Sequence, residues 1–418
     1  MTGALSTLDT VLWGVITFSV LVVLHEMGHF LAARSFGVKI HEFMLGLPGP
    51  AARIRTKNMA WGVTAIPFGG YVRIAGMEPG PEDELLGGAL AVFRETPGAN
   101  AHTLARELGV DQERADAIVH TLRDWKAIVQ DDDGACTLTL DGDVTALSAA
   151  ELAERARSVT YRGKSTPKRL AILAMGVVAN VLVALLVFTV VLSVWGYEEL
   201  TNDIGTVAPD SPAYAAGLQE GDTLLELDGK PIESWETFLL SMARTKPDQV
   251  VVVTVERQGA ELEVEAVLGA NEGHGYLGIG PGTQHVSPSV LESLGESFRL
   301  TGLVFRAILD LFNPETFATT IQGVRGVIGV SVMAAEAAHA GPLSYASLIA
   351  MLSLSVGLMN ILPIPPLDGG KMVVEIVERI MGKPINRALN LGLNVVGVLL
   401  LFSLIGYVMY ADIVRIAS

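Results

Sequence analysis

The sequence predicts a multi-pass α-helical membrane protein with about four spanning helices, a membrane-associated β-hairpin and two soluble units. Half of its 418 residues are hydrophobic, and the apolar residues gather in four runs. An apolar run of about 20 residues is long enough to cross a bilayer as a helix. A β-prone stretch follows the first run, and two charged stretches separate the others. These three observations carry the prediction.

Two of the four apolar runs are uninterrupted, whereas the first and the third contain polar residues. We predict spanning segments at residues 1–37, 165–198, 341–370 and 391–411. The first run is long and lacks both a basic start and a small-residue cleavage site, so we expect no cleavable signal peptide. It is expected to remain in the protein as a spanning helix.

The distribution of lysine and arginine predicts the orientation of the chain. Basic residues gather in residues 38–165 and in the loop 371–390, whereas the stretch after the second span opens with Glu198 and Glu199. Because cytoplasmic loops are enriched in lysine and arginine, we expect both basic regions to be cytoplasmic. Residues 202–283 are then exported, and both termini lie outside.

Residues 38–80 are predicted to form a membrane-associated β-hairpin region. Within them, residues 55–77 alternate in polarity and place Gly69 and Gly70 between two short β-prone runs, which is typical of a hairpin. Because the stretch is apolar and directly follows a spanning segment, we expect it to dip toward the membrane. Non-helical backbone is tolerated at that depth only where protein or water satisfies its polar groups.

Residues 81–160 are charged and predict a cytoplasmic insert. A short helix is expected to stop at Gly109, and a longer amphipathic helix over 112–128 is expected to be capped by Asp111. With the hairpin that follows, this order resembles a winged-helix module, a shape usually met on DNA. Residues 100–145 hold four basic and ten acidic side chains, the opposite of a phosphate-binding face. We therefore expect a protein-docking or gating role.

A second soluble unit is predicted at residues 202–283. Its stretch SPAYAAGLQEGDTLLELDGKPI resembles PDZ domains of the bacterial protease type, which bind an extended peptide alongside a strand. The alternative is a structural spacer without a ligand. Residues 288–340 follow as amphipathic helices, which we expect to lie on or against the membrane.

Charge and cysteine content argue against a nucleic-acid-binding protein and against a disulfide-stabilised fold. The formal net charge of −16 disfavours binding to nucleic acid over a broad surface. A single cysteine, Cys136, excludes an internal disulfide framework.

The first spanning segment carries His25, Glu26 and His29 as an HExxH motif. Two histidines four residues apart on a helix face one side and can bind one metal ion, and Glu26 lies where it can take a proton from metal-bound water. Placing a carboxylate in the middle of a membrane costs about 3 kcal/mol on insertion scales. A glutamate at this position is therefore disfavoured unless it has a partner or a function. The alternative is a hydrogen-bonded polar cluster between helices.

A catalytic zinc usually has three protein ligands and one open position, so we expect the third ligand in another spanning segment. Residues 360–371, NILPIPPLDGGK, hold Asp368 as their only acidic residue. Three prolines forbid a regular helix there, and broken backbone at membrane depth is tolerated only around a buried or wetted cavity. Asn360 can donate a hydrogen bond to a developing oxyanion.

Taken together, these motifs resemble those of the site-2 proteases, the zinc intramembrane metalloproteases typified by the bacterial regulator of sigma-E protease. The HExxH motif, the N-x-x-P-x-P-x-L-D-G pattern, the GGYVRIAGM stretch, the PDZ-like unit and the four spans all match, whereas residues 80–156 have no counterpart. The resemblance implies that Glu26 is the general base and that Asn360 holds the substrate or the transition state. The Zn²⁺ ligands that it implies are His25, His29 and Asp368.

The same resemblance implies what the protein acts on and where. Substrates would be single-span membrane proteins, such as anti-sigma factors, or signal-peptide remnants, cleaved in a bacterial plasma (inner) membrane. The hairpin would bind the substrate as an added strand. The hairpin residues that it implies are Gly69, Gly70, Tyr71, Val72 and Arg73.

One departure and two other classes of function complete the prediction. The family's second span usually carries a glycine-proline pair before an asparagine, whereas MGVVAN has Gly176, Val177 and Asn180. We expect altered helix bending and no loss of catalysis.

A non-catalytic membrane adaptor using the PDZ-like and winged-helix-like modules is the alternative function, and it predicts a broken metal site. A metal transporter would need polar residues distributed along a path through several spans, whereas 170–197 and 391–410 contain only a few, such as Asn180 and Asn394.

Overall fold

The computed structural model describes residues 6–417, apart from 57–58, 67–68, 78–81 and 272. Those gaps include parts of the predicted hairpin and the start of the predicted insert, which therefore lie outside the described residues. The chain divides into two compact units. One comprises Met1–Phe188 with Glu296–Ser418, and the other comprises Thr189–Gly295.

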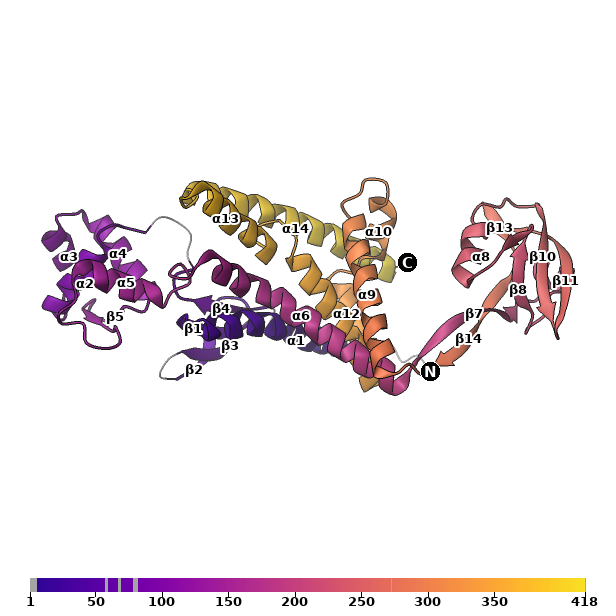
Figure 1. The fold of residues 1–418 in the computed structure, drawn as a ribbon, viewed down its shortest axis with the longest axis horizontal. Helices are drawn as coiled ribbons and strands as arrows, with labels where there is room; N and C mark the ends of the chain where they lie inside the picture. Colours follow the sequence, from indigo (N-terminus) through magenta and orange to yellow (C-terminus); the bar gives the residue numbers. More distant parts are fainter. Residues whose placement is uncertain (1–5, 57–58, 67–68, 78–81, 272, 418) are drawn as a thin grey trace. The chain divides into compact units, whose positions relative to one another are not determined.

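Four helices of the first unit are long and apolar enough to cross a membrane, as the sequence predicts. They are labelled in Figure 1 and comprise α1 (Thr7–Ser35), α6 (Thr166–Trp195), α12 (Pro342–Asn360) and α14 (Arg387–Ala417). Their outward side chains are apolar, and Leu182, Leu186 and Phe402 are more than half exposed. Exposed apolar side chains are compatible with lipid as the surrounding solvent. The backbone is compatible with lipid too, because a helix satisfies its own backbone polar groups.

Three shorter helices lie within predicted residues 288–340: α9 (Val290–Asp310), α10 (Phe317–Gly323) and α11 (Val327–Ala340). α11 packs along α1, α12 and α14, so it lies against three of the helices that are predicted to span the membrane. Its sequence, VIGVSVMAAEAAHA, consists mainly of apolar and small residues, and Ala334 and Ala335 are fully buried. Small residues allow the close approach of neighbouring helices in a membrane.

A four-stranded sheet follows α1, and it corrects the predicted hairpin. Its strands are β1 (Ile40–Leu45), β2 (Ala51–Arg55), β3 (Ala60–Thr64) and β4 (Gly70–Ile74), in the order β2-β3-β1-β4. β3 and β4 were expected to pair with each other, but β1 lies between them, parallel to β3 and antiparallel to β4. β1 contributes the buried Phe43 and Met44, and this apolar strand occupies a central position that local turn signals do not reveal.

The insert has its own hydrophobic core, formed by side chains such as Phe93, Leu104 and Ile118. Its elements are α2 (Leu86–Glu95), α3 (Ala101–Leu108), α4 (Gln112–Asp124), β5 (Ile128–Gln130), β6 (Cys136–Leu138) and α5 (Ala149–Ser158). α3 ends at Gly109 in the left-handed conformation, and the Asp111 side chain accepts a hydrogen bond from the Arg114 N–H, as expected for a helix stop and an N-cap. α4 ends at Asp124, four residues before the predicted end.

The second unit is an α+β domain around a core that includes Leu224, Phe238 and Val253. Its main sheet has the strand order β11-β10-β8-β7-β14 (Figure 1). The elements are β7 (Tyr197–Val207), α7 (Pro212–Ala216), β8 (Thr223–Leu227), β9 (Lys230–Pro231), α8 (Trp235–Met242), β10 (Val250–Arg257), β11 (Ala260–Val267), β12 (Gly269–Asn271), β13 (His274–Tyr276) and β14 (Ile279–Val286). β7 begins five residues before the predicted start at 202.

The chain breaks after α12 and resumes as helix α13 (Asp368–Met381). The predicted loop 371–390 is therefore helical over its first part. This stretch is helical because its residues repeat with helical periodicity. Glu375 and Glu378 are buried on one face of the helix. Val373, Ile376 and Ile380 are exposed on another face. Gly382 adopts the left-handed conformation with φ of 68° and ends the helix.

Candidate metal centre

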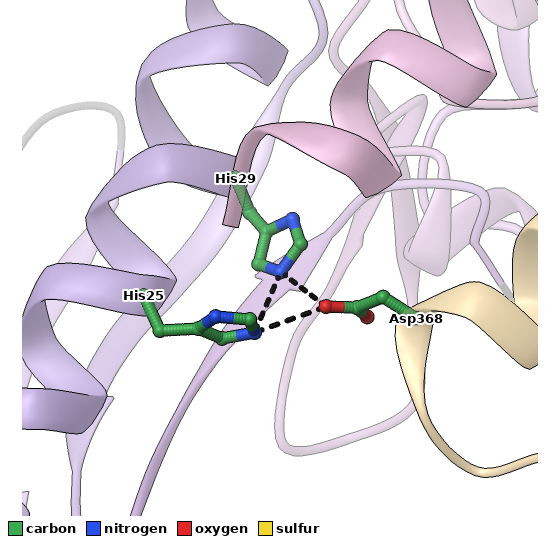
Figure 2. Close-up of side chains that lie close together, drawn as sticks. All are labelled: His25, His29 and Asp368. Atoms are coloured by element: carbon green, nitrogen blue, oxygen red, sulfur yellow. Dashed lines mark hydrogen bonds and ion pairs between the residues drawn. The ribbon is translucent and has the colours of Figure 1, made fainter. Parts of the chain in front are cut away.

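The two histidines of the HExxH motif lie one turn apart on α1, and both point to Asp368 (Figure 2). The His25 Nε2 lies 3.0 Å from the Asp368 Oδ2, and the His29 Nε2 lies 3.1 Å from the same oxygen. The two Nε2 atoms are 3.2 Å apart. All three residues are buried. The predicted ligand set therefore converges on one point.

Asp368 is held by the start of α13. Leu367 precedes the helix in an extended conformation, so the chain turns sharply from the proline-containing break into α13. The Asp368 Oδ1 accepts a hydrogen bond from the Lys371 Nζ at 3.2 Å, which leaves Oδ2 directed at the histidines. The position of the aspartate in the first turn is also favourable, because a helix N-terminus stabilises negative charge.

The three residues fit a divalent metal such as zinc by their spacing and their chemistry. A tetrahedral zinc with bonds of about 2.0–2.1 Å separates its ligand atoms by about 3.3 Å, close to the distances observed here. Two imidazole nitrogens that face each other and one carboxylate oxygen form a donor set that a shared cation satisfies. Among the described residues, His25, His29 and Asp368 form the metal-ligand group.

Residues of helix α6 contact both histidines. The His29 Nδ1 donates to the backbone carbonyl of Ile172 at 2.8 Å, which turns its Nε2 toward the centre. A Cβ atom added to Gly176 would lie only 2.3 Å from the His29 Nε2, so the glycine makes room for the ring. The Asn180 Nδ2 lies 3.5 Å from the His25 Nδ1. The sequence gives no signal for the contacts of these α6 residues with the histidines, although the MGVVAN stretch contains Gly176 and Asn180.

Glu26 lies beside the centre and is held by the sheet. Its Oε2 accepts a hydrogen bond from the Val72 N–H at 2.9 Å. Within the part of the chain that the structure describes, β4 pairs with β1 alone and is an edge strand, so this amide belongs to its free edge. The structure thus joins the HExxH helix to the β-strand that was predicted to bind substrate.

The other predicted site residues have different contacts. The Asn360 Nδ2 donates to the Val356 carbonyl at 2.9 Å at the end of α12, and no contact with the three clustered ligands is recorded among the described residues. The Tyr71 hydroxyl donates to Glu42 at 3.0 Å. Gly69 adopts a positive φ of 84° immediately before β4.

The insert contacts the same sheet through Asp124. This buried carboxylate accepts a hydrogen bond from the Gly76 N–H at 2.8 Å and lies 3.6 Å from the Arg73 guanidinium. The His41 Nε2 donates to the Asp124 carbonyl at 2.7 Å. Burial alone would raise the pKa of the Asp124 carboxyl, but the His41 ring, whose Nε2 lies 3.5 Å from the Asp124 Oδ1, and the hydrogen bond from the Gly76 N–H hold that pKa below its usual range.

The fold and the site fit one class of protein: a membrane protein in which an apolar helix carries two candidate metal ligands and an adjacent carboxylate. The model of peptidase family M50 matches residues 13–404. The chain belongs to peptidase family M50.

Individual relatives match over nearly the whole chain. "Probable protease eep" of Enterococcus faecalis is 27% identical over 91% of this chain and 92% of its own. "Zinc metalloprotease RasP" of Oceanobacillus iheyensis is 27% identical over 98% of this chain and 100% of its own. The solved PDZ domain of the SdrC-like protein from Listeria innocua is 25% identical, covers 20% of this chain and 97% of its own, and has a TM-score of 0.19.

Proposed function

We propose that the protein is an intramembrane zinc metalloprotease that hydrolyses peptide bonds within the transmembrane segments of its substrates. The observation that carries this proposal is the convergence of His25, His29 and Asp368 beside Glu26, with both histidines and the glutamate on a spanning helix. Membership of peptidase family M50 and the zinc metalloproteases among its relatives support the same reaction.

His25, His29 and Asp368 would hold the zinc, leaving a fourth position open. When bound there, zinc supplies Lewis-acid chemistry: it polarises a carbonyl and makes water acidic near neutral pH. Glu26 acts as the general base that takes a proton from the attacking water and returns it to the leaving nitrogen. The Val72 N–H, which donates to the Glu26 Oε2, keeps that carboxylate beside the centre.

The substrate is proposed to bind as an added strand at the free edge of β4. A helix hides its carbonyls in its own hydrogen bonds, so a spanning substrate must unwind before hydrolysis. Pairing with an edge strand would hold it extended and offset part of that cost. The proposed binding residues are Gly69, Gly70, Tyr71, Val72 and Arg73. Asn360, the last residue of α12 before the break that leads to Asp368, would hold the substrate or the developing oxyanion.

The two soluble regions would select and position substrates. We assign the PDZ-like unit to the exported side, where it admits substrates that have already been shortened or docks their ends. The winged-helix-like insert would lie in the cytoplasm, where Asp124 ties it to the substrate-binding sheet and allows a gating role. The expected substrates are single-span membrane proteins and signal-peptide remnants in a bacterial plasma membrane.

Reconstitution tests this function directly. The full chain is placed in lipid vesicles with a single-span substrate tagged at both ends, and the cleavage products are followed by gel. Cleavage should stop with a zinc chelator and return when zinc is restored. Cleavage at an unchanged rate in the chelator would contradict the proposal, and intact substrate under every condition would favour the non-catalytic adaptor.

A further inference from the structure

A strongly basic hollow lies where the insert, the start of α6 and the end of α13 meet. It consists of two adjoining cavities of about 510 and 620 Å³ that share several lining residues. Six cationic side chains line them: Arg157, Arg162, Lys164, Arg169, Arg379 and Lys383. Basic residues are expected beside spanning helices on the cytoplasmic side, but here six of them line one hollow in a chain whose net charge is −16.

Carboxylates compensate only part of this charge. Glu82 and Glu378 line the first cavity, and the described residues that line the second include five cationic and no acidic ones. Glu82 already pairs with the Arg157 guanidinium at 2.9 Å, and the Glu378 Oε1 accepts a hydrogen bond from the Ile385 N–H at 3.0 Å. The hollow therefore retains an excess of positive charge that favours an anionic ligand.

The Arg169 guanidinium lines both cavities and also faces a carboxylate. Its Nη1 is 2.9 Å from the Glu375 Oε2. The Arg169 Nε is buried without a hydrogen-bond partner. Burial and the neighbouring Lys168 ammonium lower the pKa of Lys164, which is the direction expected where cations are crowded.

The surroundings of the hollow match the surface of a membrane. It lies at the first turn of α6, a spanning helix, and Pro167 and Leu170 contribute to its lining. α13 exposes Val373, Ile376 and Ile380 at helical spacing. A helix with such an apolar stripe and basic residues beside it lies in the headgroup region of a bilayer.

We propose that this hollow binds the phosphate headgroup of an anionic phospholipid. Basic pockets between helices at the membrane surface are suited to such headgroups, and the N-terminus of α6 adds its partial positive charge. The bound phosphate would bridge α6, which supports His29 through Ile172, to α13, which begins at Asp368. The lipid would thus stabilise the relative position of two helices that build the metal centre.

Lipid binding by the full chain tests the proposal. The protein is placed in nanodiscs of phosphatidylcholine with increasing phosphatidylglycerol, and the lipid retained is measured by native mass spectrometry. Each cation near a headgroup contributes about fivefold to binding, so the double variant R379A/K383A should bind phosphatidylglycerol about 30-fold more weakly. The charge-preserving variant R379K/K383R should retain most of the binding.

A matched control and a soluble anion complete the test. R106A/K246A removes two positive charges from exposed positions that do not line the hollow, and it should bind like the wild type. Equal binding by R379A/K383A and by this control would overturn the proposal. If inorganic phosphate raises the thermal midpoint of the protein in pure phosphatidylcholine as much as phosphatidylglycerol does, the site is one for a soluble anion and the lipid assignment fails.

Discussion

Replacement of Gly176 by alanine should disturb the metal centre although the residue has no polar side chain of its own. The new Cβ would lie 2.3 Å from the His29 Nε2, 2.6 Å from its Cε1 and 2.8 Å from the His25 Cε1. The His29 ring cannot turn away freely, because its Nδ1 is hydrogen-bonded to the Ile172 carbonyl at 2.8 Å. The clash must therefore displace a ligand ring or the α6 backbone.

The expected magnitude follows from the role of supporting groups at metal sites. Disturbing them typically costs about 10- to 100-fold in metal affinity, or about 1.4–2.8 kcal/mol at a factor of ten per 1.4 kcal/mol. This range agrees with the cost of overpacking a filled site, about 1–3 kcal/mol. Zinc affinity, measured by competition with a chromogenic chelator, should fall by that factor, and cleavage at limiting zinc should fall with it.

The control for Gly176→Ala is Gly406→Ala. Gly406 also lies in a spanning helix, α14, but a Cβ there would meet no atom within 4 Å. This variant should keep both zinc affinity and activity. If Gly176→Ala binds zinc as tightly as Gly406→Ala, the α6 helix does not confine the histidines as the structure indicates.

Three further predictions concern other parts of the protein. Asn360→Ala should lower kcat by about 10²–10³-fold if the amide stabilises the oxyanion, with zinc affinity unchanged; a parallel loss of zinc would assign it a structural role. Because the pKa of Asp124 is lowered in the folded state, its stabilising contribution is complete above about pH 4 and is lost as the pH falls toward the lowered value. Asp124→Asn should therefore lower the thermal midpoint at pH 7 and have a smaller effect at the most acidic pH that the protein tolerates. An equal effect at both pH values would show that the pKa of Asp124 is not lowered by folding. Phe93→Ala removes a side chain that is 1% exposed in the insert core and should cost about 3–5 kcal/mol, seen as faster hydrogen exchange across the insert; unchanged exchange would show that this core does not hold the insert together.

Much of the fold was predictable because hydropathy over a long run is a local property. The four spanning helices follow directly from their apolar runs, and the stop at Gly109 and the cap at Asp111 follow from local turn chemistry. The order of strands in the sheet that follows α1 does not follow from local signals, because β1 and β3 pair across a distance in sequence and no turn residue marks that pairing. The local signal at Gly69 and Gly70 therefore indicated a hairpin between strands that do not pair.

The candidate ligands were predictable for a different reason. His25 and His29 have side chains whose spacing points to metal binding, and Asp368 is the only acidic residue in the proline-containing stretch 360–371. Supporting contacts carry no such signal: the Ile172 carbonyl and the Val72 N–H are backbone groups that any residue possesses. Gly176 could be noticed in the sequence, but the ring that it accommodates becomes apparent only once α1 and α6 are packed together.

The central claim is that Glu26 is the base of a zinc peptidase, and Glu26→Gln tests it most directly. Glutamine has nearly the same shape, and its carbonyl oxygen can still accept the Val72 N–H, so the ligands should bind zinc as in the wild type. Cleavage of a tagged single-span substrate should fall by about 10²–10⁴-fold, the contribution typical of general acid–base catalysis, while the zinc content per chain remains unchanged. Cleavage at the wild-type rate by the zinc-loaded Glu26→Gln variant would contradict the account.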